Sequence, residues 1–347
     1  MKKIAIIAGG DSSEYEVSLR SAAGIYSFLD KTQYEPVVVC IHGKEWKACL
    51  DSEKGCKEGL NLNDKSQWTD IDKNDFSFTN DGKKHTFAFA YITIHGTPGE
   101  NGLLQGYLDL IGLPYSCCGV LAAALTFNKY ACNHYLSYFG FHIANSLMLR
   151  AGQKWPNEQK IADTLGLPCF IKSNVGGSSF GCTKVKKVED IHHAIAKAFE
   201  QGDEVICESF MQGTEVTCGV YKTKNKAVAF PITEVVTHNE FFDYNAKYKG
   251  EVDEITPARI PDDIRDKIQA ETLRLYDIIG AKGIIRVDWI ITKKPTATGT
   301  EAADMQLNLL EVNTTPGMTP TSFIPQQVKA AGLTMAEVLN EIIEFSV

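Results

Sequence analysis

The sequence lacks any apolar run approaching the roughly 20 residues that a helix needs to cross a bilayer. Near the start, Lys2 and Lys3 precede only the short apolar run Ile4–Ala8, and Gly9 and Gly10 follow it. A secretory signal needs a longer apolar core and a cleavage site made of small residues. We therefore expect a cytoplasmic protein without a membrane partner.

Two common nucleotide-binding signatures are also missing. The sequence contains no G-x-x-x-x-G-K-[ST] loop, which cradles phosphates in one large class of nucleotide-binding proteins. Gly9 and Gly10 follow an apolar segment, but the G-x-G-x-x-G spacing of a dinucleotide site is absent. Any nucleotide site must therefore use another arrangement.

The ten cysteines form no CxxC motif and no His/Cys pattern with zinc-finger spacing. We expect reduced thiols, as is usual in the cytosol. The adjacent Cys117 and Cys118 admit two interpretations, a redox pair or small buried side chains on a turn, and we favour the second.

The charge balance is acidic, because 35 Lys and Arg residues stand against 43 Asp and Glu residues, a net charge of −8. This excess argues against a broad electrostatic surface for nucleic acid, so we expect no nucleic-acid partner. Any polyanion must be small and must meet locally placed cations. The length of 347 residues favours two or three domains.

The first third of the chain alternates predicted strands with a predicted helix. Lys3–Ala8, Glu35–Ile41 and Thr86–Ile94 are rich in residues that favour strands, and Val17–Leu29 has the pattern of a helix. This alternation indicates an α/β unit with a parallel sheet. The polar segment 44–84 has no clear period, and we treat it as an insertion.

Later segments begin new units. Leu121–Phe139 is predicted to be helical, and Gly166–Val185 reads as two strands around a loop of glycine and serine. After Gly213 the strands become longer, and a helix is predicted near Ile264–Ile279. We predict three domains, comprising residues 1–120, 121–212 and 213–347.

The most informative pattern lies in two runs near the carboxyl end, GIIRVDWII and LNLLEVNTTPGM. Side chains alternate faces along a strand, so Arg286 and Asp288 share one face of the first run, as Glu311 and Asn313 do in the second. If the two strands pair, their oxygens suit Mg²⁺ that also binds substrate phosphates. The alternative is a half-buried hairpin whose polar residues face water.

The run Asn174–Gly181, NVGGSSFG, can turn backbone N–H groups toward an anion, but a flexible hairpin tip explains it equally well. Lys172, on the incoming strand, adds a cation at a suitable place for a phosphate. Lys129 is a second candidate cation, and a solubilising surface lysine is the alternative.

Seven motifs in this order resemble those of the D-alanine:D-alanine ligases, members of the ATP-grasp fold. They read KIAIIAGGDSSEYEVSLRS, ITIHGTPGENGLLQGYLDLIGLPY, KSNVGGSSFG, CESFMQGTEVT, FFDYNAKY, RVDWII and LLEVNTTPGMTPTSF. The resemblance leaves out about 44–84, 150–163 and 292–304. It implies an α/β protein, α+β in its C-terminal half, with a Rossmann-like N-terminal domain, a small central domain and a C-terminal domain with a mixed sheet.

The resemblance also implies a nucleotide site between the central and C-terminal domains. The residues it assigns to ATP are Lys129, Lys172, Ser178, Ser179, Glu208, Ser209, Phe210, Met211, Glu215 and Lys247. Lys129 and Lys172 would meet the phosphates, with Lys247 toward the nucleotide, and Ser178 and Ser179 would lie in the loop that closes over it. Glu208, the backbone at 209–211 and Glu215 would hold the adenosine, with Phe210 against the adenine. Asp288, Glu311 and Asn313 would ligate two Mg²⁺ or Mn²⁺ ions.

Two D-alanines would bind beside the phosphates. The residues assigned to them by resemblance are Glu14, Val17, His95, Tyr248, Arg286, Gly317, Ser322 and Phe323. Glu14 would anchor the first ammonium group and, with Ser178 and Tyr248, form a hydrogen-bonded lid. Arg286 and the backbone N–H of Gly317 would donate to the developing oxyanion. Each of these residues could instead be a helix cap, a surface charge or part of the core.

Some positions differ from the family pattern. Ser173 and Gly176 stand where proline and an acidic residue are common, and Phe210 replaces a frequent tryptophan. The closing loop could therefore be looser and the adenine contact weaker, but no metal ligand is affected.

The implied function is ATP-dependent ligation of two D-alanines through an acyl phosphate, for peptidoglycan precursor synthesis, by a homodimer. Two alternatives stay open. One is another ATP-grasp carboxylate–amine ligase with a different second substrate, of the D-serine or D-lactate type. The other is a nucleotide-binding regulatory protein without turnover.

Overall fold

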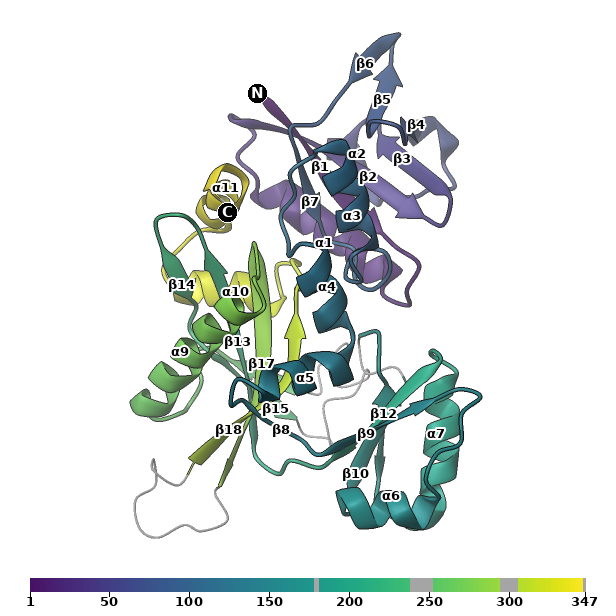
Figure 1. Ribbon diagram of the computed structural model, residues 1–347. Helices are drawn as coiled ribbons and strands as arrows, with labels where there is room; N and C mark the ends of the chain where they lie inside the picture. The colour runs from purple at the N-terminus through teal and green to yellow at the C-terminus, as the bar shows by residue number, and fades with distance from the viewer. Residues whose placement is uncertain (178–180, 238–251, 294–304, 346–347) are drawn as a thin grey trace.

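The computed structural model in Figure 1 describes residues 1–177, 181–237, 252–293 and 305–345. Within these ranges the strands form three sheets, one in each lobe of the molecule. Over the same ranges, no helix has both the length and the apolar character required to span a bilayer.

The first sheet is built on parallel strands. β1 (Lys2–Gly9) pairs in parallel with β2 (Tyr34–His42) on one side and with β7 (Phe89–Ile92) on the other. Its even and odd residues belong to two different apolar clusters, one shared with helix α1 (Tyr15–Phe28) and one with α3 (Leu103–Ile111). Helices therefore cover both faces, and the predicted parallel α/β unit is confirmed for this part of the chain.

The segment 44–84 extends this sheet with antiparallel strands. They run outward from β2 in the order β3 (Glu45–Cys49), β4 (Trp68–Asp72), β5 (Ser77–Asn80) and β6 (Lys83–His85), with α2 (Ser52–Glu58) and a 3₁₀ turn at Lys65–Gln67 between them. Trp46 packs edge-on against Tyr107, with ring centroids 5.0 Å apart. The strands of three to five residues are too short to show a period, which is why we could not assign them from the sequence.

The second sheet is antiparallel and small. Its order is β11 (Thr183–Val185), β10 (Cys169–Ser173), β12 (Glu204–Ser209) and β9 (Ser146–Arg150). Helices α6 (Glu158–Leu165) and α7 (Ile191–Phe199), the second preceded by a 3₁₀ turn at Val188–Asp190, share its core. Cys169 and Ile171 of β10 belong to this core, so the alternation turns Phe170 and Lys172 to the opposite face.

The third sheet is mixed and carries the two runs singled out above. Its strands are β16 (Val252–Ile255), β15 (Thr233–Thr237), β13 (Thr214–Lys222), β17 (Ile284–Lys293), β18 (Met305–Asn313) and β8 (His142–Ile143), with β14 (Ala227–Ala229) beside β13. Helices α4 (Val120–Phe127), α5 (Lys129–Ser137) and α9 (Asp262–Ile278) share one core with it. On the other side, Gln327 of α10 (Phe323–Ala330) accepts a hydrogen bond from Gly219 N at 2.9 Å.

Helices α4 and α5 precede the second sheet in the chain but pack on the third. Ala122 and Cys132 lie in one apolar cluster with Trp289 and Leu309. The predicted domain limits 1–120, 121–212 and 213–347 stay a prediction. Because α4 and α5 pack on the third sheet, we propose that the unit formed by the second sheet alone spans 146–209.

The last helix, α11 (Met335–Phe345), joins the first and third lobes at the end away from their meeting with the second (Figure 1). Its Leu339 and Ile342 belong to the same apolar cluster as Ile4 and Tyr34 of the first sheet and Tyr221 of the third. The helix therefore helps to fix the two lobes relative to each other.

We predict that Leu339→Ala lowers the free energy of unfolding by about 2–5 kcal/mol, because Leu339 is fully buried and the change leaves a cavity. Chemical denaturation measures this loss. Lys329→Ala, at an exposed position of the neighbouring helix α10 (Phe323–Ala330), is the control and should change stability far less. Equal effects of the two substitutions would refute the proposed packing.

Candidate active site

The pairing of β17 and β18 brings four polar side chains together. Arg286 lies opposite Asn313, and Asp288 lies opposite Glu311, so the predicted pairing of these strands is confirmed. A bulge follows between Asp288 and Trp289, beyond which the side chains return to the core. We call these four residues the Arg286 cluster.

Arg286 holds Asp288 through two parallel hydrogen bonds. Its Nε lies 2.9 Å from Oδ1 and its Nη2 lies 2.8 Å from Oδ2. Thr217 Oγ1 also donates to Asp288 Oδ1, and Asn313 Nδ2 lies 3.1 Å from Oδ2. Burial opposes the positive charge of Arg286, but the attraction of Asp288 prevails and raises the pKa of the guanidinium. Arg286 and Asp288 thus form a largely buried, doubly hydrogen-bonded ion pair within the cluster.

The cluster could hold a divalent cation only with help from a substrate. Within the described ranges, no group of three or more His, Cys, Asp or Glu residues is arranged around a common metal position. Asp288, Glu311 and Asn313 offer two carboxylates and one amide. This donor set fits Mg²⁺ or Mn²⁺, which take few protein ligands and complete their shells with phosphate oxygens and water.

Two lysines approach the cluster from neighbouring elements. Lys129 begins α5, where the side chain of Asn128 caps the helix by accepting from Ala131 N. The Nζ of Lys129 donates to Gly176 O at 2.5 Å and lies 3.9 Å from Glu311 Oε2. Asn174 accepts from Tyr130 N at 2.9 Å, so the glycine-rich loop is docked on the start of this helix.

Lys172 pairs with a carboxylate on the neighbouring strand. Its Nζ lies 2.6 Å from Glu208 Oε2, and both side chains are largely buried. Burial alone would lower the pKa of Lys172, but Glu208 outweighs it and the pKa is raised. The lysine is therefore charged and directed into a cavity.

A cavity of about 450 Å³ lies between the second and third sheets. All seven described residues that the sequence assigns to ATP line it: Lys129, Lys172, Glu208, Ser209, Phe210, Met211 and Glu215. Ser178, Ser179 and Lys247 lie outside the described residues. The structure thus brings this predicted set together around one space, which we call the larger cavity.

One end of the larger cavity is aromatic. The rings of Phe170 and Phe210 lie 5.9 Å apart, and Lys184 Nζ lies 4.1 Å from the centre of the Phe210 ring. A flat aromatic group can pack against such a wall. Opposite the lysines, burial and the carboxylates of Asp288 and Glu311 raise the pKa of Glu215 to about 8, so Glu215 can donate a hydrogen bond at neutral pH.

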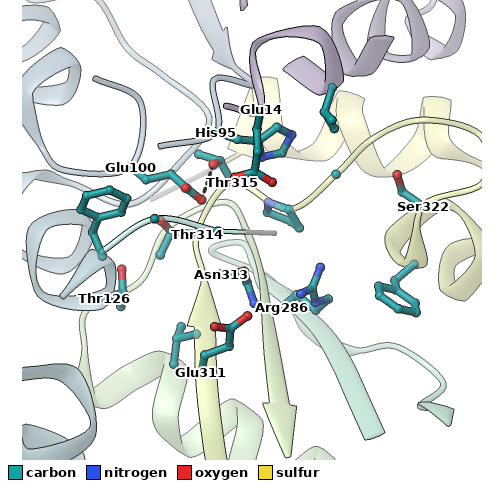
Figure 2. A pocket seen from close by; sticks show the side chains of 18 of the residues that line it. Glu14, His95, Glu100, Thr126, Arg286, Glu311, Asn313, Thr314, Thr315 and Ser322 are labelled. Atoms are coloured by element: carbon teal, nitrogen blue, oxygen red, sulfur yellow. Dashed lines mark hydrogen bonds between the residues drawn. The ribbon is translucent and has the colours of Figure 1, made fainter. Parts of the chain in front are cut away.

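A smaller cavity of about 250 Å³ lies on the other side of the Arg286 cluster, between the first and third sheets (Figure 2). The described residues assigned to the two amino acids all line it: Glu14, Val17, His95, Arg286, Gly317, Ser322 and Phe323. Tyr248 lies outside the described residues. The two cavities share Lys129, Arg286 and Glu311 as a common wall.

Two glycines let the walls of the smaller cavity come close. A Cβ on Gly177 would collide with the carboxylate of Glu14, and one on Gly317 would lie 2.9 Å from Ser322 Oγ. Ser322 precedes the first turn of α10 in an extended conformation, and its Oγ lies 2.7 Å from Thr319 Oγ1. The positive end of this helix therefore faces the cavity, where a carboxylate would be favoured.

The sequence assigned no role to several residues of the smaller cavity. Arg20, Glu100, Glu254 and Thr315 all line it. Glu100 stands five residues after His95 inside a motif used for the resemblance, so its charge in a glycine-rich loop was the signal that could have found it. Thr315 has a small hydroxyl side chain, and nothing in the sequence distinguishes it from a core residue.

Two protein-family models match this chain, one over its N-terminal part and one over its C-terminal part. The family described as D-ala D-ala ligase N-terminus matches residues 3–118, and the one described as D-ala D-ala ligase C-terminus matches residues 135–344. The D-alanine–D-alanine ligase of Bacteroides fragilis is 58% identical over 343 residues, which cover 99% of this chain and 98% of that protein.

This chain belongs to the D-alanine–D-alanine ligase family.

Solved structures agree with that placement. The VanG D-Ala:D-Ser ligase from Enterococcus faecalis is 30% identical, with a TM-score of 0.82 and 99% and 98% of the two chains covered. The ATP complex of the ligase from Bacillus anthracis is 25% identical, with a TM-score of 0.71, and 99% and 97% of the two chains are covered. The predicted α/β fold of ATP-grasp type is confirmed.

The adjacent Cys117 and Cys118 are both buried, and neither forms a disulfide. Burial raises the pKa of both thiols, that of Cys118 to about 11, so neither is a reactive thiolate at neutral pH. This favours the interpretation of small buried side chains.

Ser173 is buried, and its hydroxyl has no hydrogen-bond partner among the described residues. An unpaired buried hydroxyl costs roughly 1–3 kcal/mol, so Ser173→Ala in this ligase should raise the free energy of unfolding by about 1 kcal/mol. Ser18→Ala is the matched control, since Ser18 Oγ donates to Thr93 O at 2.7 Å, and it should lower stability. Denaturant titration measures the free energy of unfolding of both variants, and a loss of stability in Ser173→Ala would contradict the prediction.

Proposed function

We propose that the chain joins two D-alanines to D-alanyl-D-alanine at the expense of ATP, for the synthesis of peptidoglycan precursors. The observation that carries the proposal is the position of the Arg286 cluster in the wall between two cavities. The larger cavity suits a nucleotide and the smaller one suits two amino acids. Curated relatives with more than half of their residues identical are named D-alanine–D-alanine ligases.

ATP would occupy the larger cavity with its adenine at the Phe210 end and its phosphates toward Lys129 and Lys172. The two lysines neutralise phosphate charge, and Glu208 and Glu215 bind hydroxyl or amine groups of the adenosine. Asp288, Glu311 and Asn313 would hold two Mg²⁺ or Mn²⁺ ions, which supply further neutralisation of the phosphate oxygens when bound. Ser178, Ser179 and Lys247 belong to the same proposed site.

The first D-alanine would bind with its ammonium group at Glu14, near Val17 and His95. Its carboxylate is a poor electrophile and becomes reactive by attacking the γ-phosphorus of ATP, which forms an acyl phosphate and releases ADP. The protein's part in this step is to position the two groups in line and to stabilise charge.

The second D-alanine would place its carboxylate at Ser322 and the backbone N–H of Phe323, at the start of α10. Its amine, once deprotonated, attacks the acyl carbon, and negative charge gathers on the carbonyl oxygen. Arg286 and Gly317 N–H donate to that oxygen before phosphate leaves. Tyr248, with Ser178, would close the site against water, because acyl phosphates hydrolyse readily.

Other parts of the proposal rest on the family alone. We propose that the chain acts in the cytoplasm as a homodimer, with small molecules as its substrates and without nucleic acid or membrane. A ligase that uses a D-serine or D-lactate type of second substrate is not favoured. The D-Ala:D-Ser ligase found by structural comparison is 30% identical, against 58% for a D-alanine–D-alanine ligase.

Release of phosphate with a panel of D- and L-amino acids and D-lactate tests the function. We expect ADP and phosphate to form only with D-alanine present, in equal amounts with the dipeptide. Efficient turnover with another acceptor but not D-alanine would replace the proposed substrate. ATP binding without any turnover across the panel would point to a regulatory protein.

We predict that Arg286→Ala abolishes dipeptide formation and leaves ATP binding nearly intact. Loss of one oxyanion donor typically costs on the order of a hundredfold to a thousandfold in rate. Because the change also leaves Asp288 without its cation, Arg286→Lys is the second variant, which keeps the charge but not the two parallel bonds. Steady-state turnover and nucleotide titration measure both effects, and wild-type turnover in either variant would remove Arg286 from the mechanism.

A further inference from the structure

Glu100 is a partly buried carboxylate of the smaller cavity to which the mechanism above gives no role. It lies in the loop between β7 and α3, five residues after His95. One oxygen, Oε2, accepts from Gly96 N at 2.7 Å and so closes the loop on itself. The other, Oε1, accepts from Thr315 Oγ1 at 2.7 Å, a bond drawn in Figure 2.

Thr315 lies beside Glu100 in space but 215 residues later in the chain. It stands midway between Asn313, a proposed metal ligand, and Gly317, a proposed oxyanion donor. Its hydroxyl also approaches Ile94 O at 3.2 Å, immediately before His95. A single hydroxyl thus connects the loop of the first lobe to the segment 313–317 of the third lobe.

The ionised carboxylate of Glu100 does not stabilise the folded protein. Burial, and next the repulsion of Glu14, raise the pKa of Glu100 to about 7. The hydrogen bonds from Gly96 N and Thr315 and the charge of Lys129 lower this pKa, but by less than burial and Glu14 raise it. A carboxyl group whose pKa is higher in the folded than in the unfolded protein destabilises the fold progressively as the pH rises through about 7.

The remaining ionisable groups around this space come from several elements. They are Arg20, His95, Glu254, Arg286 and Glu311. None of them has a hydrogen bond or ion pair to Glu100 among those found in the described residues, so Glu14 and Lys129 dominate its electrostatic surroundings.

We propose that Glu100 and Thr315 form a positioning pair for the ligation reaction, which holds the segment 313–317 in register with the amino-acid-binding loop of the first lobe. The inference rests on the proposed function and deepens it. Without the pair, each lobe still binds its own substrate. The acyl group, the attacking amine and the Gly317 N–H then lose their mutual alignment, where an error of 1 Å can cost on the order of a hundredfold in rate.

Four single variants test the pair, together with the double variant that combines Thr315→Val and Glu100→Gln. Thr315→Val removes the hydroxyl at nearly constant shape, Thr315→Ser restores it, and Glu100→Gln removes the charge. Thr272→Val is the matched control, because Thr272 is also a buried threonine whose hydroxyl is hydrogen-bonded, at 2.7 Å to Ile268 O, but it lies in α9 away from both cavities. For each variant we would measure kcat, the KM values for ATP and D-alanine, and the Tm at pH 8.

We expect Thr315→Val and Glu100→Gln to lower kcat roughly tenfold to a hundredfold. KM for ATP should stay within about twofold, because neither residue lines the larger cavity. Thr315→Ser should recover most of the rate. The double variant should lose little more than Thr315→Val alone, as expected for two residues that act as one unit. Thr272→Val should lower Tm but not kcat.

The melting temperature separates positioning from a structural role. Glu100→Gln should have a Tm at pH 8 equal to or above that of the wild type, since it removes a destabilising charge. A lower Tm with unchanged kcat, or additive rate losses in the double variant, would overturn the proposal. If the wild type shows no ATP cleavage dependent on D-alanine, it is the proposed function that fails, and the variants are not needed to show it.

Discussion

The paired contact between Arg286 and Asp288 is the interaction on which the rest of the site depends. Both side chains are largely buried, and removing one partner of such a pair typically costs about 3–5 kcal/mol. Both residues lie on β17, where alternation puts their side chains on one face, and the pairing of β17 with β18 then sets Asp288 opposite Glu311. A slip of one residue by β18 would turn Glu311 and Asn313 away from this face and into the core. The register of two strands thus determines the wall between the two cavities.

The carboxylates of the site work against stability. Burial, and next the repulsion of neighbouring carboxylates, raises the pKa of Glu215 to about 8 and that of Glu100 to about 7, so ionising either group costs stability. Divalent cations on one side and substrate ammonium groups on the other would supply the missing positive charge. The same repulsion that weakens the free protein would therefore favour the ligands of the proposed reaction.

Much of the site could be predicted from the sequence because strand alternation fixes faces without knowledge of the fold. This rule put Arg286 with Asp288, and Glu311 with Asn313, on shared faces; that the two strands pair, and in which register, came from the structure. Strand alternation cannot predict that Glu14 and Ser322 line one cavity, because these residues come from different lobes. Only the order of the family motifs suggested that they meet. Roles assigned to residues outside the described ranges, such as that of Tyr248, remain predictions.

Other features escaped the sequence for local reasons. The predicted helical stretch 121–139 breaks at Asn128, whose side chain caps α5 and so places Lys129 at the cavity. Nothing in the apolar pattern marks that break, because both helices bury their faces in the same core. The 44–84 strands depend on contacts such as Trp46 with Tyr107, which join residues far apart in the chain. Thr315 is recognised only once Glu100 is seen beside it.

The most direct test of the central claim is anomalous diffraction from crystals of the protein grown with Mn²⁺ and a non-hydrolysable ATP analogue. The account predicts manganese peaks within coordination distance of Asp288, Glu311 and Asn313, with the terminal phosphate between these residues and Lys129. An analogue bound in the larger cavity with manganese elsewhere, and with the two strands no longer paired at Asp288 and Glu311, would contradict it.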